Sequence, residues 1–392
     1  MKMNKIKLIA LLLFATTTLG IFNACSGGNN KSENSSKSGT STLSSAEEIE
    51  NKSSENDNTD KTGSSSESKE SSQADDPTDE KEKGSVPAIP TSDDNGQVIE
   101  GIIVYNKALF ERFYGYDDLA NDYADTMLKI HTALGNDVKI YNVLVPTHCG
   151  ISLPDSVVEE NGLEDQNEYI NTIIKKYSAD SENPIVGINT YNTLMHHRDE
   201  YIYLNTDHHW SALGAYYAYK DFCKAAGVDY LRLSDMEKGE INDYYGSLTA
   251  YVDSSYVDPD TVEYYKTNKD ITTKVYENDG SGGTDTSLIH SYADSSFAYG
   301  VFLGGDNGLM VSKNNDGNGK KIAVVKESYG NAFCPYIAYT YSETHMIDFR
   351  YITFDFEQYL KDNDIHEVIF INNAMATATP ARCEELSALV SE

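Results

Sequence analysis

Short runs of apolar, mostly β-branched residues alternate with helical patterns over the C-terminal three quarters of the chain. Three such runs predict buried strands, at residues 138–145, 321–325 and 366–372. Apolar positions at helical spacing predict helices at residues 167–178 and 211–226, the second ended by Gly227. This alternation predicts an α/β fold with a mostly parallel sheet. Residues 229–320 are rich in Gly, Asp and Tyr, and we expect an irregular insertion with antiparallel pieces.

The N-terminus has the pattern of an export signal. Three lysines in the first seven residues precede the apolar run 8–14, which is too short to span a bilayer. The following Ala24-Cys25-Ser26 resembles the lipoprotein box of bacteria, which implies a signal peptide over residues 1–24 and a lipid on Cys25. That reading places the protein outside the cytoplasm, anchored in the cell membrane. An ordinary signal with an unmodified Cys25 is the alternative.

Residues 25–97 are predicted to be a disordered tether. Residues 26–86 hold 17 Ser and almost no large apolar side chain, and residues 26–100 contain no aromatic residue. Such a segment buries too little surface to offset the entropy of ordering it. About 60 flexible residues span roughly 40 Å. The folded domain is therefore expected at residues 98–392.

Charge and cysteine content narrow the classes of partner. The formal charge of −31 excludes a nucleic-acid backbone, whose binding depends on Lys and Arg. The remaining cysteines have no CxxC spacing, so they predict neither a metal site nor a redox site, and no disulfide is predicted: they are Cys149, Cys223, Cys334 and Cys383. No cofactor is expected.

The sequence Thr206-Asp207-His208-His209-Trp210 carries the first candidate chemistry. The preceding Tyr-Ile-Tyr-Leu predicts a strand over residues 201–207. On an extended segment, Asp207 and His209 share one face and His208 points to the other. A carboxylate beside an imidazole holds one tautomer and stabilises the imidazolium. A hydrogen-bonded loop anchor is the alternative, and so is a zinc site that combines this group with His196 and His197.

Ser328 is the second candidate, because it follows the strand predicted at 321–325 and precedes a helical pattern. Helix-terminal N–H groups at such a turn can receive the oxyanion of an acyl transfer. The hydroxyl needs a base, which His209 could supply. Asp207, His209 and Ser328 would then form a triad in that chain order. A simple N-cap is the alternative role for Ser328.

The two segments together resemble one known family. TDHHW followed by SALGAYYAY, and KESYGNAFCPYIA followed by IDFRYI, look like the bacterial DHHW protein family. That family is similar to the SGNH-like O-acetyltransferases of alginate and other surface polysaccharides, which have a three-layer α/β/α, flavodoxin-like sandwich. The resemblance implies that Asp207 orients, His209 acts as general base, and Ser328 carries the acetyl group. Glu327 stands where the family usually has Asp.

Further site residues are expected on weaker grounds. The oxyanion donors of ordinary SGNH enzymes have no clear counterpart here. Candidates for oxyanion or substrate contacts are Gly305, Asn307, Tyr329, Asn331, Asn372 and Arg350. For Arg350, a structural pair with Asp348 is the alternative.

Two functional hypotheses follow. The first is an exported, lipid-anchored Ser-His-Asp enzyme, an O-acetyltransferase or acetylesterase that acts on a cell-surface or cell-wall polysaccharide. A transferase would need an acetyl donor outside the cell, such as a multi-pass membrane acyltransferase. The second is a non-catalytic surface lipoprotein that binds glycan or assists its assembly, which predicts that Ser328 lies far from His209.

Overall fold

The computed structural model describes residues 77–89, 96–178 and 183–391. The predicted signal peptide, Cys25 and most of the predicted tether lie outside these residues. The statements below concern the folded unit that begins after Ser68.

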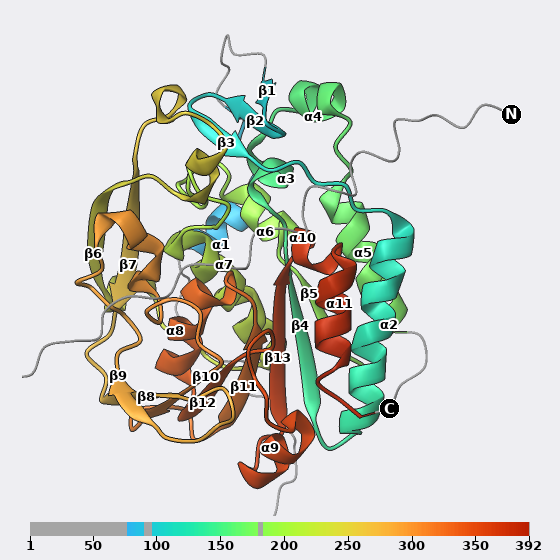
Figure 1. Ribbon diagram of the computed structural model, residues 1–392, viewed down its shortest axis with the longest axis vertical. Coiled ribbons are helices and arrows are strands. Elements are labelled where there is room, and N and C mark those ends of the chain that lie inside the picture. The colour runs from blue at the N-terminus through green and yellow to red at the C-terminus, as the bar shows by residue number, and fades with distance from the viewer. Residues whose placement is uncertain (1–76, 90–95, 179–182, 392) are drawn as a thin grey trace, which may run out of the picture. The chain divides into compact units, whose positions relative to one another are not determined.

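A single eight-stranded sheet forms the centre of this unit (Figure 1). Its strand order is β5-β4-β13-β11-β12-β10-β8-β9. The first five strands are parallel: β5 (Val186–Asn189), β4 (Lys139–Val145), β13 (Glu367–Asn373), β11 (Lys321–Lys326) and β12 (Glu343–Asp348). The last three pair antiparallel: β10 (Leu309–Asn314), β8 (Ile271–Tyr276) and β9 (Thr284–Thr286). The three strands predicted from apolar runs are β4, β11 and β13.

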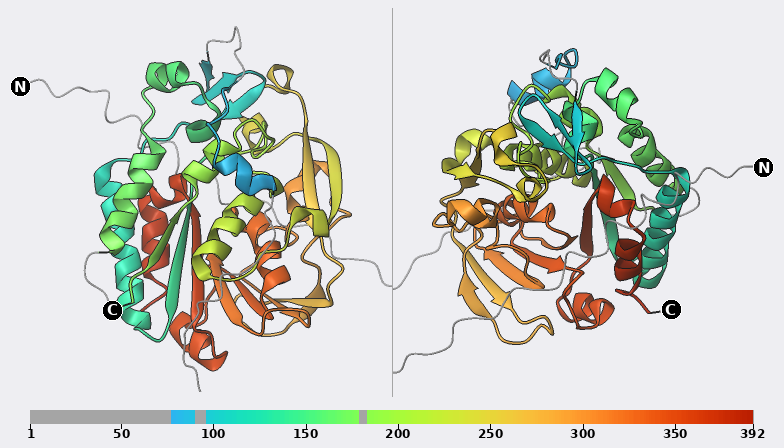
Figure 2. Two further views of the ribbon diagram at one scale, coloured as in Figure 1. Left: turned by 180° about the vertical axis from the view of Figure 1, so that it is seen from behind. Right: turned by 45° about the horizontal axis from the view of Figure 1, so that its top comes forward.

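Helices cover both faces of the sheet, so the fold has three layers (Figures 1 and 2). One face carries α2 (Asp117–Leu134), α5 (Gln166–Tyr177) and α11 (Pro380–Ser387), and the other carries α6 (Tyr191–His196), α7 (Ala212–Ala226) and α8 (Gly330–Thr340). Strand β4 shows why both faces are apolar: Ile140 and Leu144 join the α2 core, whereas Tyr141, Val143 and Val145 join the α7 core. The predicted three-layer α/β/α class is confirmed.

Helix α7 illustrates how local sequence sets an element. The Ser211 hydroxyl accepts a hydrogen bond from Gly214 N–H at the first turn. At the other end Gly227 adopts φ 65°, a left-handed conformation in which its N–H reaches the last carbonyls. The helix lies close to the preceding loop, since a Cβ on Gly214 would lie 2.4 Å from the Ile202 carbonyl oxygen. Both predicted helix boundaries are therefore marked by caps.

The remaining elements are short and are separate from the eight-stranded sheet and from the six helices named above. A three-stranded antiparallel sheet comprises β1 (Gln97–Ile99), β2 (Ile102–Tyr105) and β3 (Ala108–Phe110), and a separate pair comprises β6 (Glu237–Tyr244) and β7 (Asp260–Lys266). Short helices are α3 (His148–Ser152), α4 (Asp155–Asn161), α9 (Phe356–Asp362) and α10 (Ala374–Thr377). The 3-10 helices are η2 (Leu233–Asp235), η3 (Ser247–Ala250), η4 (Ser254–Tyr256) and η5 (Ser295–Val301).

Residues 229–320 contain antiparallel pieces, as predicted, but they do not all form a separate irregular unit. Strands β8, β9 and β10 extend the main sheet, because β10 pairs antiparallel with the last parallel strand, β12. The rest of the segment carries the β6–β7 pair and the 3-10 helices η2 to η5. This second part lies near the carboxyl ends of the central strands, through contacts described below.

The predicted tether boundary at residue 97 is wrong, because helix α1 (Pro77–Glu82) already belongs to the folded unit. Asp79 lies 2.9 Å from the buried Lys220 ammonium of α7, and Glu82 lies 2.9 Å from Lys224. Lys81 pairs with Glu200 at 2.5 Å. The segment is held by ion pairs rather than by apolar burial, so its composition alone resembles that of a disordered chain.

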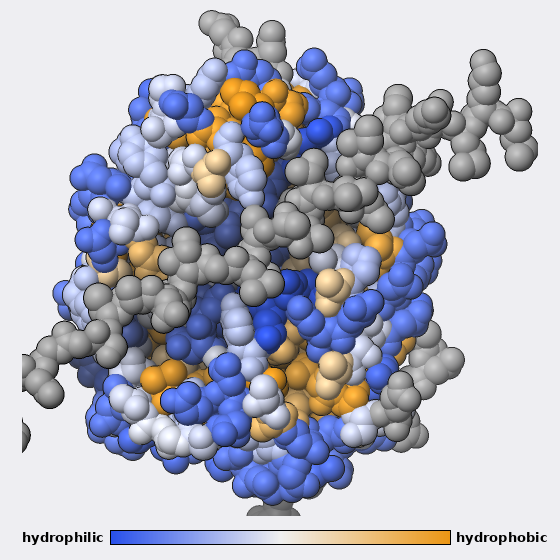
Figure 3. Space-filling view, in the orientation of Figure 1, coloured by the Kyte–Doolittle hydropathy of each residue, from blue (hydrophilic) through white to orange (hydrophobic). Residues whose placement is uncertain are grey.

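The face seen in Figure 3 is mostly hydrophilic, and its apolar residues form small separate patches. Within the described residues, no helix is both long and apolar enough to cross a bilayer.

Candidate active site

Ser328 lies at the carboxyl edge of the sheet, in the turn between β11 and α8. Strands β4, β11 and β13 are parallel and neighbouring, so their carboxyl ends meet at this edge (Figure 1). Ligand sites of open α/β sheets occur at this edge, because loops there are free to vary. The position of the Ser328 turn is therefore fixed by the buried central strands β4, β11 and β13.

Asp207 and His209 come from a loop and not from the predicted strand over residues 201–207. That loop is closed by a single bridge between Tyr203 and Trp210. The buried Asp260 carboxylate holds it, because it accepts hydrogen bonds from the N–H groups of Asn205 and Thr206, both at 2.8 Å. The predicted strand is absent because the Asp260 carboxylate, 54 and 55 residues further along the chain, takes the N–H groups that a strand would pair.

The loop and the turn bring the three main candidates together. His209 Nδ1 lies 2.5 Å from Asp207 Oδ1, and His209 Nε2 lies 2.8 Å from Ser328 Oγ. With the proton on Nδ1, the imidazole donates to the carboxylate and its Nε2 lone pair accepts the serine hydroxyl. This is the arrangement in which a histidine can remove the proton of an attacking serine.

Four donors surround the Asp207 carboxylate. Oδ1 accepts from His209 Nδ1 and from His209 N–H at 3.0 Å, and Oδ2 accepts from Tyr244 OH at 2.6 Å and Ser247 N–H at 2.8 Å. Burial alone would raise the pKa of this carboxyl, but His209, followed by His208 and Tyr244, holds the pKa well below its usual range. Asp207 therefore stays a carboxylate and has no freedom to rotate.

The His209 ring is fixed from its face as well as its edge. Tyr299 stacks on it with ring centroids 3.9 Å apart and an interplanar angle of 10°. The Tyr299 hydroxyl donates to the Ser328 carbonyl at 3.3 Å. One tyrosine thus contacts both the imidazole and the backbone of the serine turn, which limits their relative movement.

His208 does not point away from its neighbours, as a strand would require. Its ring centroid lies 3.8 Å from that of His209, and its Nδ1 lies 2.6 Å from Ser247 Oγ. Burial, followed by the neighbouring His209, lowers the pKa of His208. The three side chains of Asp207, His208 and His209 offer ligand atoms within 4.8 Å of one another. Both His209 nitrogens already face partners, however, so the geometry favours an oriented base over a metal ligand.

The backbone N–H groups at the serine turn are mostly occupied. Tyr329 N–H donates to the Glu327 carboxylate at 2.9 Å, Gly330 N–H to the Glu327 carbonyl, and Asn331 N–H to the Ser328 carbonyl. Among the described residues, Ser328 N–H has no hydrogen-bond partner. The turn therefore offers Ser328 N–H to an oxyanion, and not the predicted Tyr329 N–H.

Two of the other candidates fill structural roles near the turn. Gly305 has φ 104° and donates its N–H to the Phe302 carbonyl, so that N–H is also taken. The Asn307 amide donates to the carbonyls of Leu303 and Gly305 and closes the same turn. Each candidate stabilises a loop rather than presenting a free donor.

Charged and amide candidates are also engaged with protein groups. Arg350 binds the buried Asp348 through Nε at 2.8 Å and reaches Asp306 at 2.8 Å, so the structural alternative describes its contacts. The Asn331 amide donates to Asp306 at 2.8 Å. Asn372 points into the α2 layer, where its Oδ1 accepts from the Tyr123 hydroxyl at 2.9 Å. Asn372 therefore faces the side of the sheet opposite to α7 and α8.

A cavity of about 450 Å³ opens beside His209. It is lined by Asp207, His208, His209, Tyr244, Tyr245, Gly246, Ser247, Thr249, Ala250, Ser296, Phe297 and Tyr299. Two of its aromatic side chains face solvent, since Phe297 is 59% exposed and Tyr245 is 44% exposed. Exposed aromatic groups beside the His209 imidazole are typical of a binding site.

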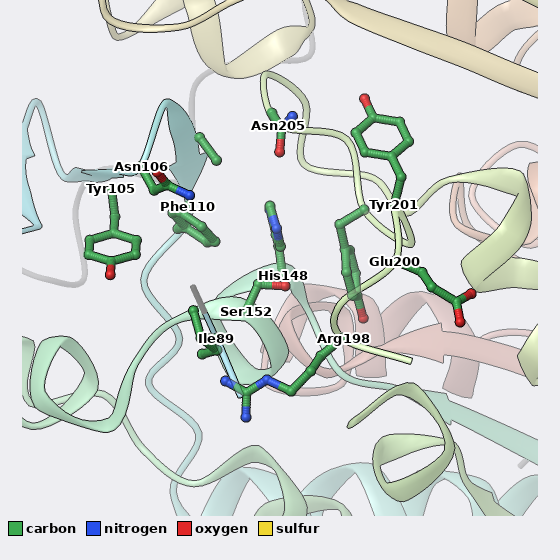
Figure 4. A pocket seen from close by; sticks show the side chains of 12 residues that line it. Ile89, Tyr105, Asn106, Phe110, His148, Ser152, Arg198, Glu200, Tyr201 and Asn205 are labelled. Atoms are coloured by element: carbon green, nitrogen blue, oxygen red, sulfur yellow. The ribbon is translucent and has the colours of Figure 1, made fainter. Parts of the chain in front are cut away.

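A second, smaller pocket of about 150 Å³ lies near α3 (Figure 4). His148 lies in its middle, with Arg198 towards one end and Asn205 towards the other. The His148 ring stacks on Tyr203, with centroids 5.0 Å apart, and burial lowers its pKa to about 3. In the described part of the chain, no carboxylate forms an ion pair with His148, so this pocket lacks an oriented base.

Sequence reasoning missed the residues that complete the site. Tyr244 and Ser247 hold Asp207 from 37 and 40 positions away, and Tyr299 stacks on His209 from within the insertion. Nothing in the local sequence marks these residues. Of the residues that complete the site, only Glu327 could have been found from the sequence. It is adjacent to Ser328 and stands where the family usually has Asp.

The fold and site together define an α/β protein with a hydrogen-bonded Ser–His–Asp group at the carboxyl edge of its sheet. The sequence matches the DHHW protein family over residues 44–347, so the chain belongs to that family. A DHHW family protein from Eubacterium siraeum is 30% identical with a TM-score of 0.68, over 77% of this chain and 98% of that one.

More distant solved structures are also similar to this chain, and Bacillus cereus PatB1 shares its fold. Bacillus cereus PatB1, solved with a sulfonyl adduct, is 17% identical with a TM-score of 0.61, over 74% of this chain and 98% of that one. The O-acetyltransferase domain of Pseudomonas putida AlgJ is 12% identical with a TM-score of 0.44, over 74% of this chain and 99% of that one. No curated protein matches this sequence.

Proposed function

We propose that this protein is a serine acyl-transfer enzyme that moves acetyl groups on or off a surface polysaccharide. The observation that carries the proposal is the 2.8 Å distance between His209 Nε2 and Ser328 Oγ, with Asp207 behind the imidazole at 2.5 Å. The non-catalytic alternative requires Ser328 to lie far from His209. The acetyl group and the polysaccharide come from the family resemblance of the motifs around these residues.

The chemistry follows from the three side chains. Ser328 Oγ attacks the carbonyl carbon of an acetyl ester while its proton passes to His209 Nε2. The tetrahedral oxyanion collapses, the ester C–O bond breaks, and His209 returns the proton to the departing alcohol. A sugar hydroxyl or water then attacks the acetyl-serine and gives its proton to His209. The second tetrahedral intermediate collapses, the bond between the acetyl carbon and Ser328 Oγ breaks, and His209 returns the proton to Oγ. Asp207 stabilises the imidazolium in both steps.

The cavity supports a sugar-sized acceptor. Its solvent-facing aromatic side chains, Phe297 and Tyr245, can pack against the apolar faces of sugar rings. Transfer and hydrolysis differ in whether an acceptor hydroxyl replaces water at the acetyl-serine. The structure therefore supports one site for both reactions.

Export and lipid attachment are part of the same proposal. The N-terminal signal pattern and Cys25 would place the folded unit at the outer face of a membrane on a long tether. Polysaccharide acceptors lie on that side. A protein at the outer face of the membrane needs a donor of acetyl groups there, and a multi-pass membrane acyltransferase could supply them. Cys25 would attach the protein to membrane lipid.

The test uses the purified protein with p-nitrophenyl acetate and with an acetylated polysaccharide, alone and with deacetylated acceptor. We expect release of acetate or p-nitrophenol, or appearance of new acetyl esters on the acceptor. Ser328→Ala should lose at least about 10³-fold in rate, because the nucleophile is gone. Wild-type protein that forms no acetyl-serine with any donor would contradict the proposal. A radiolabelled acyl-lipid in cells, lost in Cys25→Ala, tests the anchor separately.

A further inference from the structure

Glu327 is a buried side chain at the centre of the serine turn, and its contacts account for the orientation of that turn. It is 5% exposed and directly precedes Ser328. One carboxylate oxygen accepts from Asn373 N–H at 3.1 Å and from the Asn373 amide at 3.0 Å. The other accepts from Tyr329 N–H at 2.9 Å and lies 3.3 Å from Ser328 Oγ.

These contacts join two neighbouring strand ends. Ser328 and Tyr329 follow β11, and Asn373 ends β13, the strand that pairs with β11 in parallel. The Asn373 side chain also caps the short helix α10, since its Oδ1 accepts from Ala376 N–H. Among the described residues, Glu327 has no cationic partner within ion-pair distance, so uncharged donors alone compensate for its burial.

The contacts of Glu327 determine which backbone N–H group of the serine turn is free to bind a substrate oxygen. Of the four N–H groups from Ser328 to Asn331, three are used within the turn, and one of these three is the Tyr329 N–H held by the Glu327 side chain. Without that acceptor, the Tyr329 N–H would be free to turn towards the nucleophile. With it, Ser328 N–H is the remaining backbone donor beside Oγ.

The carboxylate also affects the serine hydroxyl. The hydroxyl has one hydrogen, and two acceptors lie near it: His209 Nε2 at 2.8 Å and the Glu327 oxygen at 3.3 Å. The shorter contact is the reactive one. Because Oγ is common to both, Glu327 contacts the hydroxyl while the shorter contact keeps its proton facing His209.

We propose that Glu327 is a positioning residue for acylation of Ser328: it holds the turn so that Ser328 N–H faces the oxyanion and Ser328 Oγ faces His209. This inference deepens the proposed function and rests on it, since it needs Ser328 to be the nucleophile. Glu327 itself touches no reacting atom of the substrate and exchanges no proton. It acts through Tyr329 N–H and through its contact with the Ser328 hydroxyl.

The main variant is Glu327→Gln, which keeps the size of the side chain. An amide has one acceptor oxygen, so it cannot serve both Tyr329 N–H and Asn373 N–H, and its NH₂ group would face a donor. The second variant is Asn373→Asp, which keeps the α10 cap acceptor but replaces the amide donor by a second carboxylate against Glu327. Glu343→Gln is the matched control, because Glu343 pairs with His345 at 2.9 Å at the opposite, amino-terminal end of β12.

The assay is the rate at which phenylmethylsulfonyl fluoride modifies the full-length protein, followed by intact mass. In this reaction the Oγ–S bond forms, the S–F bond breaks, the hydroxyl proton passes to His209 and fluoride leaves. The split between kcat and KM for p-nitrophenyl acetate distinguishes positioning from general loss of structure. Thermal unfolding shows whether each variant is folded.

We expect Glu327→Gln to react about 10²-fold more slowly than wild type, with kcat for p-nitrophenyl acetate reduced to a similar degree and KM within about threefold. Asn373→Asp should slow the reaction at least about tenfold, whereas Glu343→Gln should stay within about twofold. A folded Glu327→Gln that reacts at the wild-type rate overturns the inference. If that variant does not fold, wild-type reactivity in Asn373→Asp overturns it instead.

The two proposals fail in different ways. A wild-type protein that reacts with the sulfonyl fluoride but transfers no acetyl group contradicts the proposed function and still tests Glu327. A wild-type Ser328 that does not react at all contradicts both, because no activated nucleophile is then present.

Discussion

Replacing Asp207 by Asn is the sharpest test of how the site works, because all four contacts of this side chain come from donors. Two N–H groups of His209 point at Oδ1, and Tyr244 OH and Ser247 N–H point at Oδ2. An asparagine has one acceptor oxygen and one NH₂ group. Either orientation therefore places a donor against at least one donor that cannot move.

The two orientations have different consequences, and both reduce activity. If the NH₂ faces His209, Nδ1 must become the acceptor and Nε2 carries the proton, so the ring cannot accept the Ser328 proton. If the oxygen faces His209, the NH₂ opposes Ser247 N–H and the imidazolium loses a charge partner 2.5 Å away. We expect kcat to fall about 10³–10⁴-fold, which corresponds to about 4–5.5 kcal/mol of transition-state stabilisation.

The assay compares Asp207→Asn with Tyr244→Phe on p-nitrophenyl acetate. Tyr244→Phe removes one of the four donors to Asp207 and leaves the charge, so we expect a loss of only about 3–10-fold, near 1 kcal/mol. Near-ultraviolet circular dichroism checks that both variants keep tertiary structure. If Asp207→Asn retains activity within about tenfold of wild type while Ser328→Ala has none, the imidazole does not depend on Asp207 and the reasoning is refuted.

Three further predictions concern packing and charge. Gly246→Ala places a Cβ 2.4 Å from the Asp207 Cβ, so we expect at least about 10²-fold lower activity with about 1–3 kcal/mol lower stability; unchanged kinetics contradict this. Lys326→Met removes the ammonium that pairs with the buried Asp348 and leaves that carboxylate with Arg350 alone. We expect the free energy of unfolding in urea to fall by about 2–4 kcal/mol, and an unchanged value contradicts a stabilising role for the Lys326–Asp348 pair. Burial alone would raise the pKa of Glu82, but hydrogen bonds in its ion network lower it to about 2, so its contribution is present above about pH 4.5 and lost towards pH 2. Wild type should therefore exceed Glu82→Gln by about 1–2 kcal/mol at pH 7 but not at pH 2; a constant difference contradicts this.

The strands and helices with strong periodicity could be predicted because their own residues determine them. Strand β4 is apolar on both faces since it lies between two helix layers, and α7 carries caps at both ends. The predicted strand over residues 201–207 was wrong for the opposite reason. Its backbone is held by Asp260, and no local pattern reveals a partner that distant.

The same distinction applies to the candidate site, where distinctive side chains could be predicted and backbone donors could not. Asp207, His209 and Ser328 are side chains with distinctive chemistry, so the sequence could propose them as a group, and the structure places them within hydrogen-bond distance. The oxyanion donors could not be predicted reliably, because every residue except Pro carries a backbone N–H and the sequence does not show which of these groups is free. Tyr329 was a reasonable candidate by position, but its N–H is held by the neighbouring Glu327 carboxylate.

On the proposed function, the insertion would connect acceptor binding to the orientation of His209. Tyr244 and Ser247 hold Asp207, while Tyr245, between them in the chain, is exposed in the wall of the cavity. Phe297 and Tyr299 repeat this arrangement, since Tyr299 stacks on His209 and Phe297 faces solvent. An acceptor that packs on the exposed rings would restrict the same two segments that fix Asp207 and His209. Acceptor binding should therefore also order the catalytic group, and truncating Tyr245 or Phe297 should lower kcat as well as raise KM.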